Sequence, residues 1–326
     1  FEMQKIEELM YKRASEMLES GEVDRVIAWK KGETCYDVSP ATFTKDNLEG
    51  FVYDAFCGAN LSKYLVEESK KGGKILVFLK PCDTYSFNQL LSEHRIKREH
   101  VYVIGIECQG KIDANTLQKK GIDGILSVEE KGDNLTVKTL YGDKEATFEE
   151  ALSVKCETCK SKEFAVSDET IVLNEMRDNK EKRFEAVERL EKMTEEERYA
   201  FWQAELSKCI RCNACRNVCP ACTCTHCVFD NDKSGIAGKA NADSFEEKLF
   251  HIIRSYHVAG RCTDCGECSR VCPQNIPLHL INRKYIKDMN EFYGEYQAGA
   301  AVTALNPIED YTKEYVEAAT VVGGKK

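Results

Sequence analysis

The sequence lacks any apolar run long enough to cross a membrane. Its longest uninterrupted apolar stretches, Ile75–Leu79 and Val101–Ile106, are far shorter than the roughly 20 residues of a spanning helix. An excess of basic charge is also missing, because 46 Lys and Arg residues stand against 55 Asp and Glu residues, a formal charge of -9. Nucleic acids and anionic membranes are bound by basic surfaces. We therefore expect a chain with no membrane span that does not bind nucleic acid.

The first ten residues carry acidic side chains and no apolar signal-peptide core. What the sequence does have is cysteine, which accounts for 17 of its 326 residues. That number is odd, too sparse for a disulfide-built miniprotein and high for an ordinary cytosolic enzyme. The apolar content of 42% and charged content of 31% are typical of a folded chain. These features predict a cytoplasmic protein in a reducing compartment, where free thiols bind metal.

Residues 1–165 predict an α/β domain with a mainly parallel sheet. A strand is expected at residues 23–29, and the two apolar runs 75–79 and 101–106 are separated by a helical stretch at 86–94. Continuous apolar strands that alternate with helices are typical of a parallel sheet covered on both faces. The fold class is therefore an α/β N-terminal domain, followed by a helical C-terminal domain of the dicluster ferredoxin type.

The rest of the chain divides by composition. Residues 166–205 are densely charged and predict a helical connector, in which Thr194 and Glu197 form a capping box. A coiled-coil partner surface is the alternative, although apolar positions do not persist over several heptads. The dicluster domain occupies residues 206–285. Residues 286–326 lack a core-like pattern and predict an arm that lies on another subunit, or a flexible tail.

The strongest motif is C-x2-C-x2-C-x3-C-P, which occurs twice. In this spacing three thiolates bind one 4Fe-4S cluster and the fourth binds the other cluster. One predicted cluster therefore has the ligands Cys209, Cys212, Cys215 and Cys272. The other has the ligands Cys262, Cys265, Cys268 and Cys219. Zinc sites use paired C-x2-4-C ligands and do not explain a trailing Cys-Pro in both copies. A helix expected at residues 245–256 should pack across both clusters.

Three further cysteines, Cys222, Cys224 and Cys227, follow the first motif directly. With His226 or Cys35 they would hold zinc or a further iron–sulfur cluster, and the alternative is inert thiols packed near the clusters. No catalytic acid, base or nucleophile is predicted. The histidines have no paired carboxylate pattern, so surface or packing roles are expected for His226, His251, His257 and His279.

A third group of cysteines lies in the α/β domain. Cys82 and Cys108 follow the two apolar runs, and parallel strands end at the same sheet edge, where open α/β folds hold ligands. Cys156 and Cys159 add a C-x2-C pair. These four thiols form a candidate third 4Fe-4S site, with structural buried thiols as the alternative. Cys35 and Cys57 are expected to be ordinary core thiols.

The segments KILVFLKPCDTYSFNQLL, VYVIGIECQGK and CETCKSKEFAVSD resemble the beta subunits of deazaflavin-coenzyme-reducing hydrogenases and formate dehydrogenases. The block CIRCNACRNVCPACTCTHC and the second motif are similar to the ferredoxin extension of the formate dehydrogenase version. This resemblance implies a cluster on Cys82, Cys108, Cys156 and Cys159. It also implies FAD and electron transfer between a two-electron carrier and a catalytic subunit.

The sequence departs from this family at the flavin site. It has FCGANLSKYL in place of a glycine-rich helix start, and KPCD in place of TPCQ. Gly58, Lys80 and Asp83 are the candidate cofactor-binding residues at these positions. Gly58 would open a helix N-terminus to a phosphate, and a plain helix cap is the other interpretation.

We therefore expect an electron-transfer subunit of a multi-subunit anaerobic oxidoreductase that relays electrons through three 4Fe-4S clusters. The expected partner is a formate dehydrogenase, hydrogenase or heterodisulfide-reductase-like subunit. The first alternative is a flavin-containing subunit that itself oxidises or reduces NAD(P)H or a deazaflavin coenzyme. The second is a structural zinc module.

Overall fold

The N-terminal region is built on one six-stranded sheet that is mainly parallel. The computed structural model describes residues 2–160, 162–234 and 244–309. The strands β1 (Arg25–Lys31), β4 (Ile75–Leu79), β5 (Val101–Ile106) and β9 (Glu169–Ile171) are parallel neighbours in that order. Two further strands, β2 (Val38–Phe43) and β3 (Phe51–Val52), pair antiparallel with β1. The predicted α/β class with a parallel sheet is confirmed.

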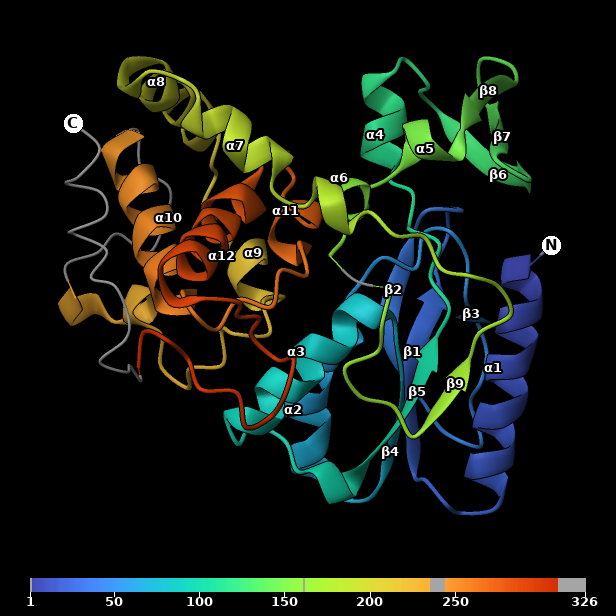
Figure 1. Cartoon of the computed structure of the whole chain (residues 1–326). Helices are drawn as coiled ribbons and strands as arrows, with labels where there is room; N and C mark the ends of the chain where they lie inside the picture. Colours follow the sequence, from blue (N-terminus) through green and yellow to red (C-terminus); the bar gives the residue numbers. More distant parts are fainter. Residues whose placement is uncertain (1, 161, 235–243, 310–326) are drawn as a thin grey trace.

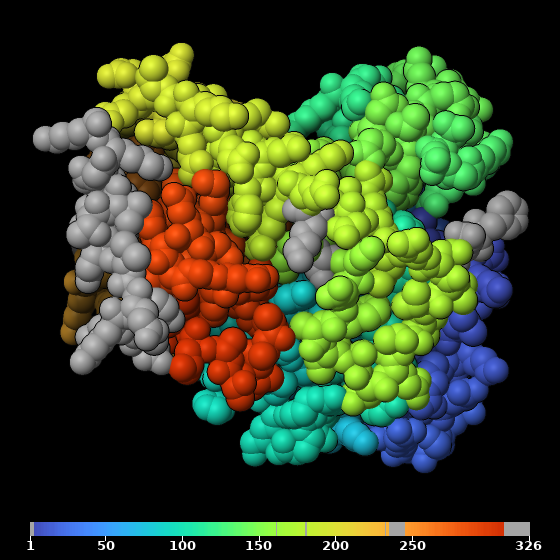
Figure 2. All heavy atoms as spheres, in the orientation of Figure 1, coloured from blue at the N-terminus to red at the C-terminus, as the bar shows by residue number. Residues whose placement is uncertain are grey.

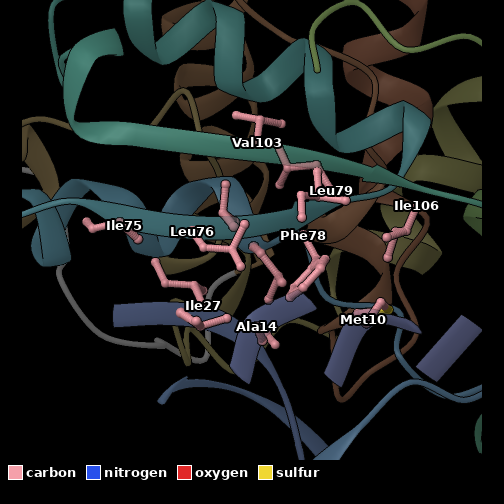
Figure 3. Close-up of a cluster of buried hydrophobic side chains, with 14 of the residues drawn as sticks. Met10, Ala14, Ile27, Ile75, Leu76, Phe78, Leu79, Val103 and Ile106 are labelled. Atoms are coloured by element: carbon pink, nitrogen blue, oxygen red, sulfur yellow. The ribbon is translucent and has the colours of Figure 1, made fainter. Parts of the chain in front are cut away.

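Helices cover both faces of this sheet. In Figure 1, α1 (Glu2–Glu19) lies on one side, and α2 (Leu65–Glu68) and α3 (Pro81–Ser92) lie on the other. Figure 3 shows Met10 and Ala14 of α1 close to Ile27 and Phe78 of the strands. All five side chains of β4 are buried, because both faces of this central strand are covered. α3 begins at Pro81, earlier than the expected helical stretch, so Cys82 lies in its first turn.

A small lobe is formed by the chain between β5 and β9. It contains α4 (Ala114–Lys119), the antiparallel strands β6 (Ile125–Lys131), β7 (Asn134–Thr139) and β8 (Lys144–Thr147), and α5 (Phe148–Ala151). An isolated bridge between Ile112 and Leu152 closes the lobe at its base. The helix α6 (Val154–Glu157) begins just beyond that bridge, beside the segment that leaves β5.

The charged segment expected as a connector contributes to both regions. Its first part forms β9, which pairs with β5 and which the sequence did not predict. Its last part forms α7 (Glu185–Glu191) and α8 (Glu195–Leu206). The predicted capping box is present at the start of α8, where the Thr194 side chain accepts from Glu197 N and the Glu197 carboxylate accepts from Thr194 N.

The C-terminal region is helical. Its elements are α9 (Ala214–Asn217), the 3-10 turns η5 (Val228–Asp230) and η6 (Asp232–Ser234), α10 (Ser244–Val258), α11 (Glu267–Arg270) and α12 (Leu278–Tyr293). α10 corresponds to the helix expected between the two cysteine motifs. α12 runs across the expected start of the arm at residue 286, so residues 286–293 belong to the helix.

The described part of the expected arm packs on its own chain. Asn88 Nδ2 of α3 donates to Gly299 O at 3.0 Å, and Tyr296 Oη donates to Gly260 O at 2.8 Å. Figure 2 shows this orange-to-red segment against the cyan part of the α/β region. Residues 310–326 of the expected arm lie outside the described residues. Among the helices described, none combines the length and apolar character needed to cross a membrane.

Candidate metal centres

The four cysteines of the α/β region line one small cavity: Cys82, Cys108, Cys156 and Cys159. β4 and β5 pair with Leu79 opposite Gly105, and each of the first two cysteines lies three residues beyond that pair. The closed base of the small lobe positions the other two. Ser153 N donates to Lys111 O at 2.8 Å, and Lys111 N donates to Cys156 Sγ at 3.4 Å. The shared sheet edge and the returning lobe therefore gather thiols from three segments.

The lining of this cavity includes the basic side chains Lys80, Lys111, Lys155 and Arg177 but no carboxylate. Burial raises the pKa of Cys108, and it raises the pKa of Cys156 to about 12. Free thiols here are therefore protonated at neutral pH, and a metal that binds them must displace those protons. Four thiol donors in a pocket lined by basic rather than acidic side chains fit an anionic iron–sulfur cluster.

The thiols Cys209, Cys212, Cys215 and Cys272 line a second cavity together with Phe250, His251, Ile276 and Leu278. Three of these cysteines come from the first motif, and Cys272 comes from the end of the second. The charge of Cys272 adds to burial in raising the pKa of Cys215, as expected for neighbouring thiols. The structure thus brings together the four cysteines that the crossed pattern groups.

Cys219 lies with the thiols of the second motif. Burial raises the pKa of Cys262, Cys265 and Cys268, and the charge of Cys219 adds to the increase in each case. For Cys265 and Cys268 the pKa rises to about 12. Cys219 also interacts with Cys222 and Cys215, so the assignment of Cys219, Cys262, Cys265 and Cys268 to one cluster stays a prediction.

The two motifs fold into the same backbone shape. Arg211 and Asp264 occupy equivalent positions and have φ of 53° and 56°, while Asn213 and Gly266 have φ of 61° and 69°. A one-turn helix, α9 or α11, then carries the third cysteine. Left-handed conformations are unusual for Arg and Asp, so this shared backbone shape reflects an internal duplication built around the thiols.

The three additional cysteines, Cys222, Cys224 and Cys227, line a third cavity of about 370 Å³. Its other lining residues include Lys63, Arg216, Arg254 and Arg261, but neither His226 nor Cys35. Cys35 instead packs against the small lobe, and Cys57 is buried in the sheet core. Within the described ranges, no three His, Cys, Asp or Glu side chains are grouped to hold a single metal ion. A cluster has a different requirement, because each thiolate binds its own iron.

The candidate flavin-site residues all have partners inside the protein. Lys80 Nζ lies 2.6 Å from Asp83 Oδ2, with both side chains buried, and it donates to Ala59 O at 2.7 Å. Gly58 O accepts from Lys155 Nζ at 2.6 Å. Asn60 caps the short 3-10 helix η1 (Leu61–Tyr64), so the helix-cap role belongs to Asn60. Gly58, Lys80 and Asp83 therefore bond to other residues of the α/β region, and their role in binding a cofactor stays a prediction.

A network of buried charges between the two regions was missed by the sequence reasoning. Lys155 Nζ lies 2.6 Å from Glu267 Oε1, and Arg270 Nε donates to the same carboxylate at 2.9 Å. Burial opposes the charge of Glu267, but Arg270 and Lys155 outweigh it and hold the carboxyl pKa well below its usual range. The available signal for this network was the charged residues within the segments CETCK and CTDCGEC. Sequence spacing alone does not show which of these residues pair with each other.

Asp264 forms the second part of this network. Its carboxylate accepts from Arg183 Nε at 2.8 Å and from Arg283 Nε at 3.0 Å. Burial opposes the Asp264 charge, but the two arginines outweigh it and lower the pKa of Asp264 well below its usual range. Lys160 Nζ also donates to Thr263 O. The ligand loops of the two regions are therefore joined by contacts between residues that flank their cysteines.

Comparison with known proteins gives consistent results. A family model described as a 4Fe-4S dicluster domain matches residues 205–276. The F420-dependent formate dehydrogenase subunit beta of Methanocaldococcus jannaschii is 25% identical, over 83% of this chain and 86% of its own length. The F420-dependent formate dehydrogenase 1 subunit beta of Methanococcus maripaludis is also 25% identical, over 84% of this chain and 87% of its own length.

A solved structure, the F420-reducing [NiFe] hydrogenase complex from Methanosarcina barkeri, has a TM-score of 0.34 and 17% identity. It covers 45% of this chain and 56% of that chain, a likeness too low to support an argument. The likeness to the two formate dehydrogenase subunits and the dicluster match are the informative results. Over more than four fifths of its length the chain is similar to beta subunits of F420-dependent formate dehydrogenases, and it is an iron–sulfur electron-transfer subunit of an oxidoreductase complex.

Proposed function

We propose that this chain holds three 4Fe-4S clusters and relays electrons to or from a formate dehydrogenase, hydrogenase or heterodisulfide-reductase-like subunit. The observation that carries the proposal is the gathering of twelve cysteines into three groups of four. The N-terminal group lines its own cavity, and the two C-terminal groups combine thiols from both motifs. When bound, such clusters supply one-electron transfer at a potential that the surrounding protein sets.

The fold of this chain holds the cysteine ligands in place and shields most of them from water. Cys156, Cys215, Cys268 and Cys272 are buried, and most of the other assigned ligands are half-buried. Cys212 is the exposed member of the first motif. An edge that is open to solvent suits electron exchange with a partner, because direct approach to a cluster shortens the transfer distance.

The segment 155–160 supports an order for the three groups. Cys156 and Cys159 belong to the N-terminal group, while the flanking Lys155 and Lys160 contact Glu267 and Thr263 O between the cysteines of the second motif. The group of Cys262, Cys265, Cys268 and Cys219 therefore lies between the other two. Electrons would enter or leave at the N-terminal group and at the group containing the exposed Cys212.

The second candidate is a subunit that also binds FAD and itself converts NAD(P)H or a deazaflavin coenzyme. It is favoured by the names of the two formate dehydrogenase relatives, which are described as F420-dependent. The internal pairing of Lys80 with Asp83 and the cap role of Asn60 remove the specific contacts expected for a flavin at those positions. A relay without a flavin is the function we favour.

Iron and flavin analysis of the anaerobically purified complex tests this choice. We expect about twelve irons per chain and no released FAD. Cys82→Ser and Cys159→Ser should each remove about four irons, whereas the matched control Cys35→Ser should remove none. Unchanged iron in the first two variants would refute the N-terminal site. Stoichiometric FAD would favour the second candidate, and zinc in place of iron would exclude both.

A further inference from the structure

The buried face of α10 carries two polar side chains that face the cysteines of the C-terminal region. Phe250 on this face packs among Cys215, Cys268 and Cys272 in the local apolar cluster. His251 and Arg254 are also buried, at 2% and 3% exposure, and they lie three residues apart on the same helix. Residues at this spacing share a helix face. α10 therefore presents a histidine and an arginine to the candidate cluster sites.

Arg254 is a buried cation without a carboxylate partner among the described residues. Its Nη2 donates to Cys215 O at 3.1 Å, and its Nε has no hydrogen-bond partner. Another deeply buried arginine, Arg283, instead pairs with Asp264 at 3.0 Å. An unpaired buried charge costs several kcal/mol, so the charge of Arg254 requires compensation from another group nearby.

The surrounding thiols are the candidates for that compensation. Cysteines of both motifs lie within electrostatic range of the Arg254 guanidinium group, namely Cys219, Cys268, Cys215 and Cys222. These cysteines include members of both groups in the C-terminal region. Ligation converts thiols to thiolates, so Arg254 would face negative charge from both cluster sites at once.

His251 points to one site only. It lines the cavity of Cys209, Cys212, Cys215 and Cys272, and neither of its ring nitrogens has a partner. Burial disfavours a charged ring at this position, and a neutral imidazole carries one N–H donor. Buried polar groups are almost always hydrogen-bonded. The unpaired ring therefore indicates an acceptor in that cavity, and cluster sulfur is such an acceptor.

We propose that Arg254 and His251 are positioning residues that raise the reduction potentials of the two C-terminal clusters. Arg254 acts on both, and His251 acts on the cluster of Cys209, Cys212, Cys215 and Cys272. A cluster gains one negative charge on reduction, so a fixed positive charge stabilises its reduced form more than its oxidised form. An N–H donated to cluster sulfur acts in the same direction. This inference rests on the proposed presence of the clusters.

The test is an EPR-monitored redox titration of the anaerobic complex, with iron analysis of every variant. At a fixed potential, Arg254→Gln should lower the ratio of reduced to oxidised cluster at least tenfold at both C-terminal clusters. That change corresponds to a shift of about 59 mV for a one-electron couple. His251→Leu should lower one potential only, and by less. The matched control Lys248→Gln removes a charge from the same helix on the side that contacts Tyr199 and Gln203, and it should leave both potentials unchanged.

Iron content separates the two proposals. Wild-type protein without iron in the C-terminal region would refute the proposed function itself. Full iron with unchanged potentials in Arg254→Gln would overturn this inference alone. If Arg254→Gln loses iron, the variant Arg254→Lys tests the role of the positive charge instead. Native iron content with near-native potentials would support that role. Low potentials or lost iron in Arg254→Lys would exclude it. Equal shifts of both clusters in His251→Leu would overturn the assignment of His251 to one site.

Discussion

The two regions of this molecule are held together by different means. The α/β region has an extensive apolar core in which β4 is buried along its whole length and Trp29, Phe78 and Phe87 are fully enclosed. The buried cluster of the helical region is much smaller. It consists of Leu206, Phe229, Phe250, Ile276 and Leu278, together with Cys215, Cys268 and Cys272. Cysteine thus takes the place of aliphatic side chains in the second region.

The difference shows where each region obtains its stability. Burial of apolar surface stabilises the sheet without any ligand. In the helical region, α9 and α11 are single turns that do not persist without external support. Arg211, Asn213 and Asp264 hold left-handed backbone conformations next to the cysteines. Because metal-binding free energy becomes folding free energy when the site forms only on folding, we expect iron to stabilise mainly the helical region.

Removal of iron should have the largest effect and should separate the two regions. After chelation under reducing conditions, we expect hydrogen-exchange protection to be lost across α10, α11 and α12 and retained in β4 and β5. The reason is that the sheet core does not depend on thiolate ligation, whereas the helical core does. Hydrogen exchange followed by mass spectrometry measures both regions in one sample. Retained protection in α10 would show that the helical region is stable without metal.

A cavity in the sheet core tests the other half of the comparison. Phe78→Ala should lower the free energy of unfolding of the α/β region by about 3–5 kcal/mol. The matched control Leu140→Ala changes a side chain that is 68% exposed and should cost less than about 0.5 kcal/mol. Chemical denaturation of the iron-free chain measures both. A loss below about 1 kcal/mol for Phe78→Ala would mean that the sheet core is not the main source of stability.

The buried ion pair between the regions sharpens the comparison at their boundary. Glu267→Gln leaves the buried Lys155 and the partly exposed Arg270 without their carboxylate, so we expect a cost of about 3 kcal/mol in the iron-loaded protein. The double variant Lys155→Met with Glu267→Gln removes one of those cations and should recover part of the loss. Denaturation of the iron-loaded single and double variants provides the measurement. A double variant no more stable than Glu267→Gln would show that Lys155 and Glu267 are not coupled.

The smallest effect concerns β9 at the sheet edge. Glu169 on β9 accepts from Arg13 Nε at 3.0 Å, and this bond, opposed by burial, lowers the Glu169 pKa. A lowered pKa stabilises the folded protein at pH values above the unfolded-state pKa of about 4.3. This contribution is lost as the pH falls through the folded-state pKa. Glu169 is 37% exposed, so solvent screens the pair and Glu169→Gln should cost about 0.5 kcal/mol at pH 7.

This small difference should fade towards pH 3, where the Glu169 carboxylate becomes protonated. Denaturation of the iron-free chain between pH 7 and pH 3, compared with Glu169→Gln, measures the change. A cost that stayed constant with pH would exclude an ionic origin.

Much of the α/β region was predictable because its signals are local. The apolar runs of β4 and β5 formed strands where the sequence placed them, and the Thr194 capping box formed as expected in the charged segment that follows this region. The strand β9 could not be predicted, because only Ile171 of its three residues is apolar and the segment becomes a strand by pairing with β5. The buried ion pair between Lys80 and Asp83 was likewise not predicted, since the sequence indicated these two residues only as candidate cofactor contacts.

The sequence by itself determined the thiol loops, because three cysteines at fixed short spacing restrict the backbone conformations that can surround a cluster. It also determined the parallel strands, because a continuous apolar run must be covered on both faces. Only the tertiary structure decided which charges meet in the interior. Lys155 and Glu267 are 112 residues apart in the chain, and Arg254 approaches cysteines of both motifs from a helix between them. Such contacts depend on how whole elements pack, so no local pattern encodes them.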